Sequence, residues 1–321
     1  MRKGTKKVND KTLTKIKDTS NQIANELDAD VLLVNAPIEN GLDDDIICAV
    51  DDRKRRKNIF LILVTPGGDA NASYRIARCL QDSYERFIAF VSGYCKSAGT
   101  LCVLGANEIV MSDMGELGPL DVQVYKKDEL FEASSGLVAS EALSALQSRA
   151  FEMFEEYFLA IQVKSGNRIT FKTATEIAAK ISVGLLEPLY KQIDPLHVGE
   201  IARSMKIARD YGKRLMLRSH NYDDKTLDML VETYPSHGFV IDKPEAETLF
   251  RNVRGSTETE KNLRKLLGKV AHLPKGRNQI FEFLSEEIKG EKNENENKNV
   301  KTNNSGESKA RRNTSRNKKD S

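Results

Sequence analysis

The sequence predicts an α/β fold whose first half is a mostly parallel sheet and whose second half is helical. In residues 30–123, short apolar runs alternate with stretches whose apolar residues recur at helical spacing. Strands separated by helices in this way indicate βαβ units and a parallel sheet. Beyond Gly136 the helical spacing continues for about 26 residues, which predicts a helix close to 40 Å long. Because a compact domain seldom needs such length, its apolar stripe is a candidate for contact with another subunit as well as for the core.

The apolar runs locate four strands, and the patterns between and after them locate the helices. The strands are expected at residues 30–36, 58–65, 87–91 and 108–111. Helices are expected after Asp69, from Ser97, and over residues 138–162, 196–216, 223–233, 244–252 and 256–270. Since no clear linker divides the two halves, residues 21–285 are predicted to form one domain.

The ends of the chain are basic, whereas the body between them is acidic. The 321 residues carry a formal charge of +3. Residues 1–17 hold seven basic residues against one acidic residue, and residues 1–20 are interpreted as a basic N-terminal arm or helix. A nucleic-acid-binding fold would carry its basic stripe on the folded domain. Nucleic acid is therefore not an expected partner, except for weak contact through the basic C-terminal end.

Residues 286–321 are predicted to form a disordered, low-complexity tail. From Gly290 onward this stretch holds one Val, one Ala and no aromatic residue. Such a composition cannot bury enough apolar surface to offset the entropy of ordering the chain.

Composition also predicts a cytoplasmic protein. The longest apolar run, Ile59–Val64, has six residues, whereas a membrane span needs roughly 20. The charged N-terminus leads into polar sequence rather than into the apolar stretch of a signal peptide. The four cysteines form no CxxC pair, which is typical of reduced thiols in a chain of this length.

Two loops at the ends of predicted strands carry the residues suited to chemistry. In Thr65-Pro66-Gly67-Gly68-Asp69, successive glycines allow two backbone N–H groups to turn toward one point. In Gly93-Tyr94-Cys95-Lys96-Ser97-Ala98-Gly99-Thr100, a serine lies where a strand passes into a helix. Ser97 could simply cap that helix. Together, however, a hydroxyl at a helix start and a glycine loop about thirty residues upstream supply a nucleophile and oxyanion donors.

The sequence lacks the motifs of several other classes of enzyme. The serine segment is not the G-x-S-x-G turn of α/β-hydrolases, because Cys95 occupies the place of the first glycine. The sequence contains no GxxxxGK[ST], HExxH or GxGxxG, and no two histidines have the i,i+4 spacing that favours a metal. We therefore expect neither a cofactor nor a metal.

Two segments resemble the serine dehydrogenase proteinase family, a soluble branch related to signal peptide peptidase A and to the Clp protease/crotonase superfamily. They are VTPGGDANASYRIARCL and GYCKSAGTLCVLGANEIVMSDMGELGPLDVQ, and the similarity extends over roughly residues 30–250. The resemblance implies a Clp/crotonase-like spiral of ββα units that assembles into homo-oligomers. It also implies a serine nucleophile at Ser97 and an oxyanion hole formed by the N–H groups of Gly68 and Ala98.

The general base does not follow directly from the resemblance. Clp-like relatives have a histidine about 25 residues after the serine, where this chain has Asp121 and no histidine. One hypothesis exchanges the positions: Ser97 attacks, His237 accepts its proton, and Asp121 orients the imidazole. Alternatively His237 is only a hydrogen-bonded turn residue. His197, His220 and His272 are interpreted as surface, capping or turn residues.

A lysine is the second candidate for the base, as in relatives with a Ser/Lys dyad. The helix expected to carry that lysine, over residues 138–162, contains none. Lys126, Lys127 and Lys164 flank it and are expected to face solvent, as is Lys96 beside the serine.

The favoured function is a serine peptidase that cleaves peptide bonds of a protein or peptide substrate through an acyl-enzyme on Ser97. Two alternatives belong to other classes. A crotonase-type enzyme would use the same oxyanion hole to hold an acyl-CoA enolate, and would need a glutamate beside it. A catalytically silent oligomeric scaffold would use the long helix and the tail to recruit partners.

Overall fold

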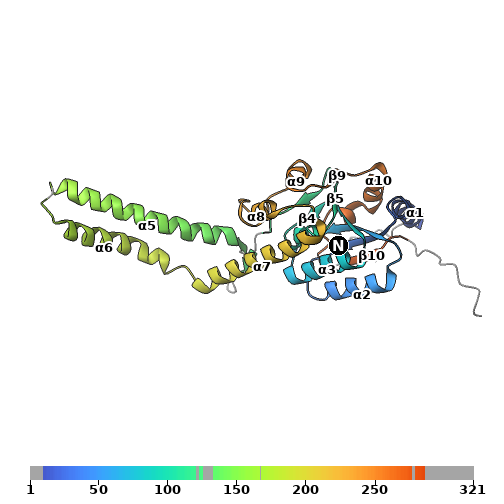
Figure 1. Cartoon of the computed structure of the whole chain (residues 1–321), viewed down its shortest axis with the longest axis horizontal. Coiled ribbons are helices and arrows are strands. Elements are labelled where there is room, and N and C mark those ends of the chain that lie inside the picture. Colours follow the sequence, from blue (N-terminus) through green and yellow to red (C-terminus); the bar gives the residue numbers. More distant parts are fainter. Residues whose placement is uncertain (1–9, 121–122, 126–132, 167, 277–278, 286–321) are drawn as a thin grey trace, which may run out of the picture. The chain divides into compact units, whose positions relative to one another are not determined.

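The computed structural model describes residues 10–120, 123–125, 133–166, 168–276 and 279–285. Its centre is a six-stranded sheet in the order β10-β1-β2-β3-β5-β9 (Figure 1). The strands are β1 (Ala29–Asn35), β2 (Asn58–Val64), β3 (Arg86–Val91), β5 (Glu108–Met111), β9 (Val253–Gly255) and β10 (Ile280–Phe283). All neighbours pair in parallel except β1 and β10. The expected α/β class and mostly parallel sheet are therefore confirmed.

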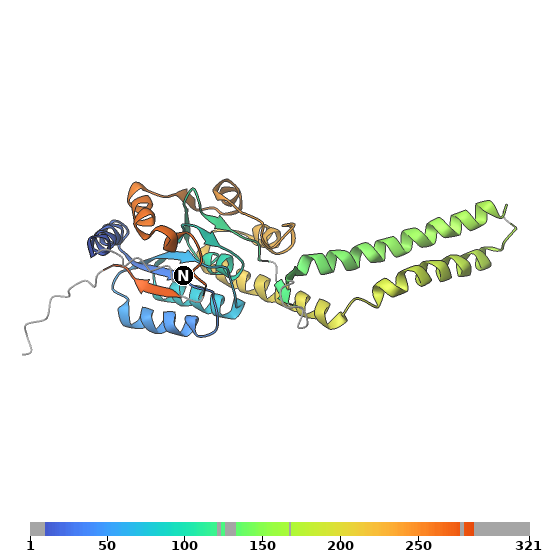
Figure 2. The same cartoon turned by 180° about the vertical axis from the view of Figure 1, so that it is seen from behind.

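The central strands carry apolar residues on both of their faces because both faces of the sheet are covered. Alternate residues of a strand point to opposite faces, so Leu61 and Leu63 of β2 join one core while Phe60 and Ile62 join the other. Helices α2 (Leu42–Arg53) and α3 (Ala70–Ser83) cover the first face, and α1 (Asp10–Leu27) and α10 (Glu258–Leu267) cover the second (Figures 1 and 2).

Helix α1 crosses the boundary that the sequence suggested between residues 20 and 21. It runs without interruption from Asp10 to Leu27. Its buried residues Ile23 and Ala24 belong to the core cluster on the second face of the sheet. The part of the basic N-terminal segment that is described therefore belongs to the folded domain. Residues 1–9 and the predicted tail at 286–321 lie outside the described residues.

The helical second half begins with α5 (Gly136–Lys164), which matches the long helix expected there. It packs against α6 (Phe171–Tyr190), a helix that the sequence patterns had not indicated (Figure 2). The other helices are close to their expected ranges: α7 (Pro195–Ser219), α8 (Asp224–Glu232) and α9 (Lys243–Leu249). Of the described helices, none is long and apolar enough to cross a membrane.

Short pairs of strands lie beside the main sheet. Strand β4 (Tyr94–Cys95) pairs in parallel with β6 (Glu116–Leu117), and β7 (Gln123–Tyr125) pairs with β8 (Ala133–Ser135). The β4–β6 pair is important for function because α4 (Ala98–Val103) begins three residues after β4, with Ser97 at its N-terminal cap.

Candidate active site

Hydrogen bonds through Thr65 join the glycine loop to the serine segment. The Thr65 amide donates to the carbonyl of Tyr94 at 2.9 Å, and the Lys96 amide donates to the carbonyl of Thr65 at 3.1 Å. These contacts form a parallel bridge between Thr65 and Cys95. Two loops separated by about thirty residues in sequence are thereby fixed side by side, in agreement with their positions at the ends of strands.

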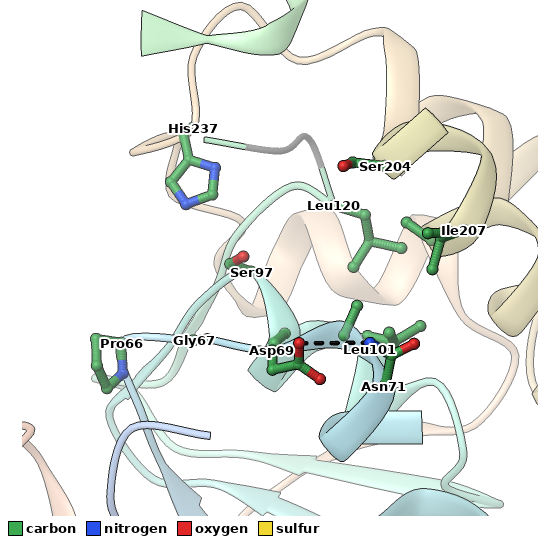
Figure 3. A pocket seen from close by; sticks show the side chains of 14 residues that line it. Pro66, Gly67, Asp69, Asn71, Ser97, Leu101, Leu120, Ser204, Ile207 and His237 are labelled. Atoms are coloured by element: carbon green, nitrogen blue, oxygen red, sulfur yellow. Dashed lines mark hydrogen bonds between the residues drawn. The ribbon is translucent and has the colours of Figure 1, made fainter. Parts of the chain in front are cut away.

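Ser97 has an unusual backbone conformation and does not cap its helix through its side chain. Its φ is 51° and its ψ is −118°, in a region that non-glycine residues rarely adopt and that clusters at functional sites. The N-cap position of α4 makes no side-chain capping hydrogen bond. The interpretation of Ser97 as a simple helix cap is therefore wrong. Its hydroxyl borders a cavity instead (Figure 3).

The glycine loop fits between the serine segment and Ile38 only because both of its glycines lack a Cβ. Gly67 and Gly68 have φ values of 107° and 142°. A Cβ on Gly67 would lie 2.8 Å from the Cβ of Ser97, and one on Gly68 would lie 2.1 Å from the carbonyl oxygen of Ile38. The loop is held in place by Ile38, whose amide donates to Gly67 and whose carbonyl accepts from Asp69.

Two backbone N–H groups beside Ser97 are available to a ligand. Gly68 and Ala98 both line the cavity. Within the described part of the chain, neither amide donates to a carbonyl or side chain of the protein. For Ala98 the reason is its position in the first turn of α4, where helical N–H groups have no partner in the helix.

The cavity has a volume of about 440 Å³ and two chemically different sides. Its polar residues include Asp69, Asn71, Ser97, Ser204 and His237, and its apolar wall is formed by Leu101, Leu120, Ile207 and Ala208. Figure 3 shows Leu101, Leu120 and Ile207 grouped together, on the side away from His237.

Helix α7 supplies part of the wall, which the sequence did not reveal. Ile207 and Ala208 lie on α7, about 110 residues after Ser97 in the chain. Tyr211 fixes this helix against α3, since its hydroxyl donates to Asn71 at 2.8 Å and its ring stacks on Tyr74 with centroids 4.2 Å apart. No motif marks these residues, because their role depends on tertiary packing alone.

His237 lines the same cavity as Ser97. It lies in a turn in which the amide of Phe239 donates to the carbonyl of Ser236 at 3.0 Å. Figure 3 shows its imidazole above Ser97, with the ring directed toward the serine side chain. Thus the structure brings together Ser97, His237, Gly68 and Ala98.

Asp121, expected as the partner of the histidine, lies outside the described residues. The residue before it, Leu120, lines the cavity, and its amide donates to the carbonyl of Leu230 at 2.8 Å. Asp121 as a group that orients His237 therefore stays a prediction.

Lys96 does not face solvent, so that expectation is wrong. Its side chain is 3% exposed, and its ammonium contacts the carbonyl oxygens of Leu117 (2.9 Å) and Phe239 (3.0 Å) and a carboxylate oxygen of Glu116 (3.0 Å). The spacing of apolar residues could not show this, because the space for the side chain comes from Gly118 in another segment. Lys164 is exposed as expected, and Lys126 and Lys127 lie outside the described residues.

The other described histidines and the buried cysteine near Ser97 give no sign of a catalytic role. His220 ends α7 in a left-handed conformation, the carbonyl of His272 accepts from the amide of Tyr94, and the side chain of His197 is outside the described set. Burial raises the pKa of the Cys95 thiol well above its ordinary value. Cys95 is therefore a neutral core residue near the serine rather than a nucleophile.

Comparison with known protein families gives a match over the segment that contains the glycine loop and Ser97. Residues 36–137 match the family model of ClpP-like SDH-type serine proteinases. That segment contains the glycine loop and Ser97, so the resemblance seen in the sequence is confirmed there.

Two relatives are uncharacterized proteins of Methanocaldococcus jannaschii. One is 32% identical over 134 residues, covering 39% of this chain and 44% of the relative. The other is 36% identical over 81 residues, covering 25% of this chain and 28% of the relative. The chain thus spans less than half the length of the curated relatives it matches.

Among solved structures, the chain is similar to a serine-to-alanine mutant of the 1510-N membrane-bound stomatin-specific protease. The two share 21% sequence identity with a TM-score of 0.30, and the match covers 46% of this chain and 68% of that one. A second is the 1510-N membrane protease specific for a stomatin homolog from Pyrococcus horikoshii, with a TM-score of 0.25, 18% identity, and coverage of 75% and 98%.

Proposed function

We propose that this protein is a serine peptidase that cleaves peptide bonds through an acyl-enzyme on Ser97. The observation that carries the proposal is the placement around a single cavity of one hydroxyl, one imidazole and two amides that have no acceptor among the described residues. The Ser97 hydroxyl makes no helix-capping hydrogen bond, and the residue has a positive φ of 51°. The family match over residues 36–137 supports the same class of reaction.

The reaction would proceed in two stages on these groups. His237 accepts the proton of the Ser97 hydroxyl as its oxygen attacks the peptide carbonyl, and the N–H groups of Gly68 and Ala98 bind the oxyanion that forms. His237 then gives the proton to the departing amine, which leaves an ester on Ser97. Water attacks that ester with His237 again as the base, and the acid product leaves. In this scheme Asp121 holds the imidazole in the required orientation.

The cavity supports a peptide as the substrate. The apolar wall of Leu101, Leu120 and Ile207 beside the serine suits an aliphatic side chain of the residue whose carbonyl is attacked. An extended peptide could also add as a strand along the glycine loop. Cytoplasmic location remains part of the proposal.

Homo-oligomer formation is part of the proposal as well, and α5 and α6 are the elements that favour it. Several large apolar residues on these helices are strongly exposed, among them Phe151 (64%), Val163 (77%) and Val183 (63%). Large exposed apolar surfaces of this kind mark interaction sites.

A fluorophosphonate probe, which reacts with activated serines, tests the proposal directly. We expect the wild-type protein to be labelled at Ser97, as mapped by mass spectrometry, and Ser97→Ala to be unlabelled. His237→Asn should slow labelling by about 10²-fold or more, because the base is removed. His220→Asn is the matched control, since His220 ends a helix away from the cavity and asparagine tolerates its left-handed conformation. A folded wild-type protein that is not labelled would contradict the proposal.

The acyl-CoA alternative is less well supported by the residues of the cavity. Among the described residues that line it, Asp69 is the sole carboxylate, and its side chain caps α3 by accepting from the Ala72 amide at 2.8 Å. A thermal shift with acyl-CoA, in the absence of fluorophosphonate labelling, would favour that alternative. A scaffold without catalytic activity would show neither response.

A further inference from the structure

The lysine beside the nucleophile is buried, and every proton of its ammonium has an acceptor. The Lys96 residue is 2% exposed. Its Nζ lies 2.9 Å from the carbonyl oxygen of Leu117, 3.0 Å from that of Phe239 and 3.0 Å from Oε2 of Glu116. A charged ammonium has three protons and no lone pair. In this arrangement Lys96 cannot accept the proton of Ser97, so it is not the base of a Ser/Lys dyad.

The three acceptors belong to two segments that meet near the cavity. Glu116 and Leu117 form β6, which pairs with the strand before Ser97. Phe239 lies two residues after His237, and the same segment is joined to β6 by two hydrogen bonds of 3.0 Å between Leu117 and Ile241. The ammonium therefore connects the residue next to Ser97 to the turn that carries His237.

The surroundings of Lys96 are shaped for a long, cationic side chain. A Cβ on Gly118 would lie 2.7 Å from Cδ of Lys96, so the absence of a side chain there makes room for the lysine. Glu116 balances the charge, which is necessary because an unpaired buried charge is strongly destabilising. The ring of Tyr94 lies 5.6 Å from the ammonium, within the range of a cation–π contact.

We propose that Lys96 is a positioning residue of the active site, whose ammonium holds the His237 turn in register with Ser97. This inference rests on the proposed function, in which His237 is the base. The hydrogen bond to the Phe239 carbonyl is the contact that sets the position of the turn, and Glu116 forms an ion pair with the ammonium at 3.0 Å. Without the ammonium, the segment is still joined to β6 through Leu117 and Ile241, but the Phe239 carbonyl, closer to His237, loses its donor. The imidazole then no longer stays at the distance and angle that proton transfer requires.

The test measures fluorophosphonate labelling in a double-mutant cycle. We expect Lys96→Met to slow labelling of Ser97 by at least about tenfold, because small displacements of a catalytic group have large effects on rate. In a His237→Asn background, the same substitution should change the rate by less than about twofold, since residues that act as a unit are not additive. For peptide hydrolysis, kcat should fall much more than KM rises.

Two further variants separate positioning from charge balance. If Lys96 served only to neutralise Glu116, the double variant Lys96→Met with Glu116→Gln would recover wild-type labelling, and the proposal would be overturned. We expect it to remain slow, because the Phe239 carbonyl still lacks its donor. Lys261→Met is the control: it removes an exposed ion pair of 2.8 Å with Glu258 and should leave the rate unchanged.

The outcomes distinguish this inference from the proposed function. If wild type is not labelled at all, the proposed function fails. If wild type is labelled but folded Lys96→Met reacts at the wild-type rate, or slows equally with and without His237, Lys96 does not act through the histidine. Should Lys96→Met fail to fold, as judged by circular dichroism, Lys96→Gln is put through the same cycle with the same criteria. Its polar amide ends one bond short of the ammonium position, so the contact with the Phe239 carbonyl is still lost.

Discussion

At the scale of single residues, the candidate site depends on glycines, which have no side chain, as much as on the groups proposed to react. Gly68 combines a positive φ of 142° with contact to the Ile38 carbonyl, where an added Cβ would lie at 2.1 Å. Its amide also lines the cavity and, like that of Ala98, donates to no other residue in the described part of the chain. The backbone conformation that requires glycine and the proposed oxyanion contact therefore belong to the same residue.

We expect Gly68→Ala to be destabilising and to abolish labelling of Ser97. Strain at positive φ costs about 1–3 kcal/mol, and relief of the clash with Ile38 must shift the loop that carries the amide. Gly41→Ala is the matched control: Gly41 also has a positive φ, of 105°, but a Cβ there meets nothing within 4 Å. It should lose stability in urea unfolding yet keep its labelling rate. Equal labelling of the two variants would contradict an oxyanion role for the Gly68 amide.

The thiols allow a residue-scale prediction about pH. Burial raises the pKa of Cys102 to about 12, from a reference value of 9.0. Between these values the unfolded chain loses the thiol proton while the folded protein keeps it, so stability falls as pH rises. We expect the wild-type protein to lose about 1 kcal/mol more than Cys102→Ala between pH 9 and pH 10, measured by urea unfolding. Below pH 8 the pH dependence of the two proteins should be the same.

At the scale of elements, the sequence predicted the helices and strands whose apolar residues recur regularly because one or both faces are buried. Strands β2 and β3 and helix α5 were expected close to their observed bounds. Helix α6 was missed although it is a regular helix with a Thr170 cap. Its apolar residues include Ile181, Val183 and Leu185, all more than a third exposed. The pattern therefore lacks the clear polar and apolar faces on which recognition depends.

The exposed apolar residues of α5 carry the prediction that belongs to this scale. If α5 takes part in a homo-oligomer, replacing Phe151 with Ser should shift the protein toward smaller species in analytical ultracentrifugation, because a residue that is 64% exposed in one chain would be buried between chains. Glu156→Ser is the control, since Glu156 lies on the same helix and pairs with Arg149 at 3.7 Å. An unchanged distribution for Phe151→Ser would show that this part of α5 is not in the interface.

At the scale of the whole molecule, the candidate site is assembled from segments far apart in the chain. Ser97 and Gly68 could be found from sequence because strand ends and small residues mark them locally. His237 could be proposed through the family resemblance but not positioned. The apolar wall from α7 and the contact of Lys96 with Phe239 could not be found, because both depend on packing between segments separated by more than a hundred residues.

The C-terminal boundary of the fold leads to the last prediction. Strand β10 covers the edge of β1, and just beyond it the amide of Leu284 donates to Val31 at 2.8 Å while Ser285 accepts from the Val31 amide at 3.2 Å. Phe283 and Leu284 are each at most 9% exposed, and burying such side chains contributes about 1.5–3 kcal/mol apiece.

We therefore expect a chain that ends after Ser285 to keep its unfolding midpoint and its rate of Ser97 labelling, because the predicted tail contributes no core. A chain that ends after Gln279 loses β10 and exposes the edge of β1, so its free energy of unfolding should drop by at least about 3 kcal/mol. Both are measured by urea unfolding beside the full chain. Loss of stability on removing residues 286–321 alone would mean that the tail packs on the domain and is not disordered.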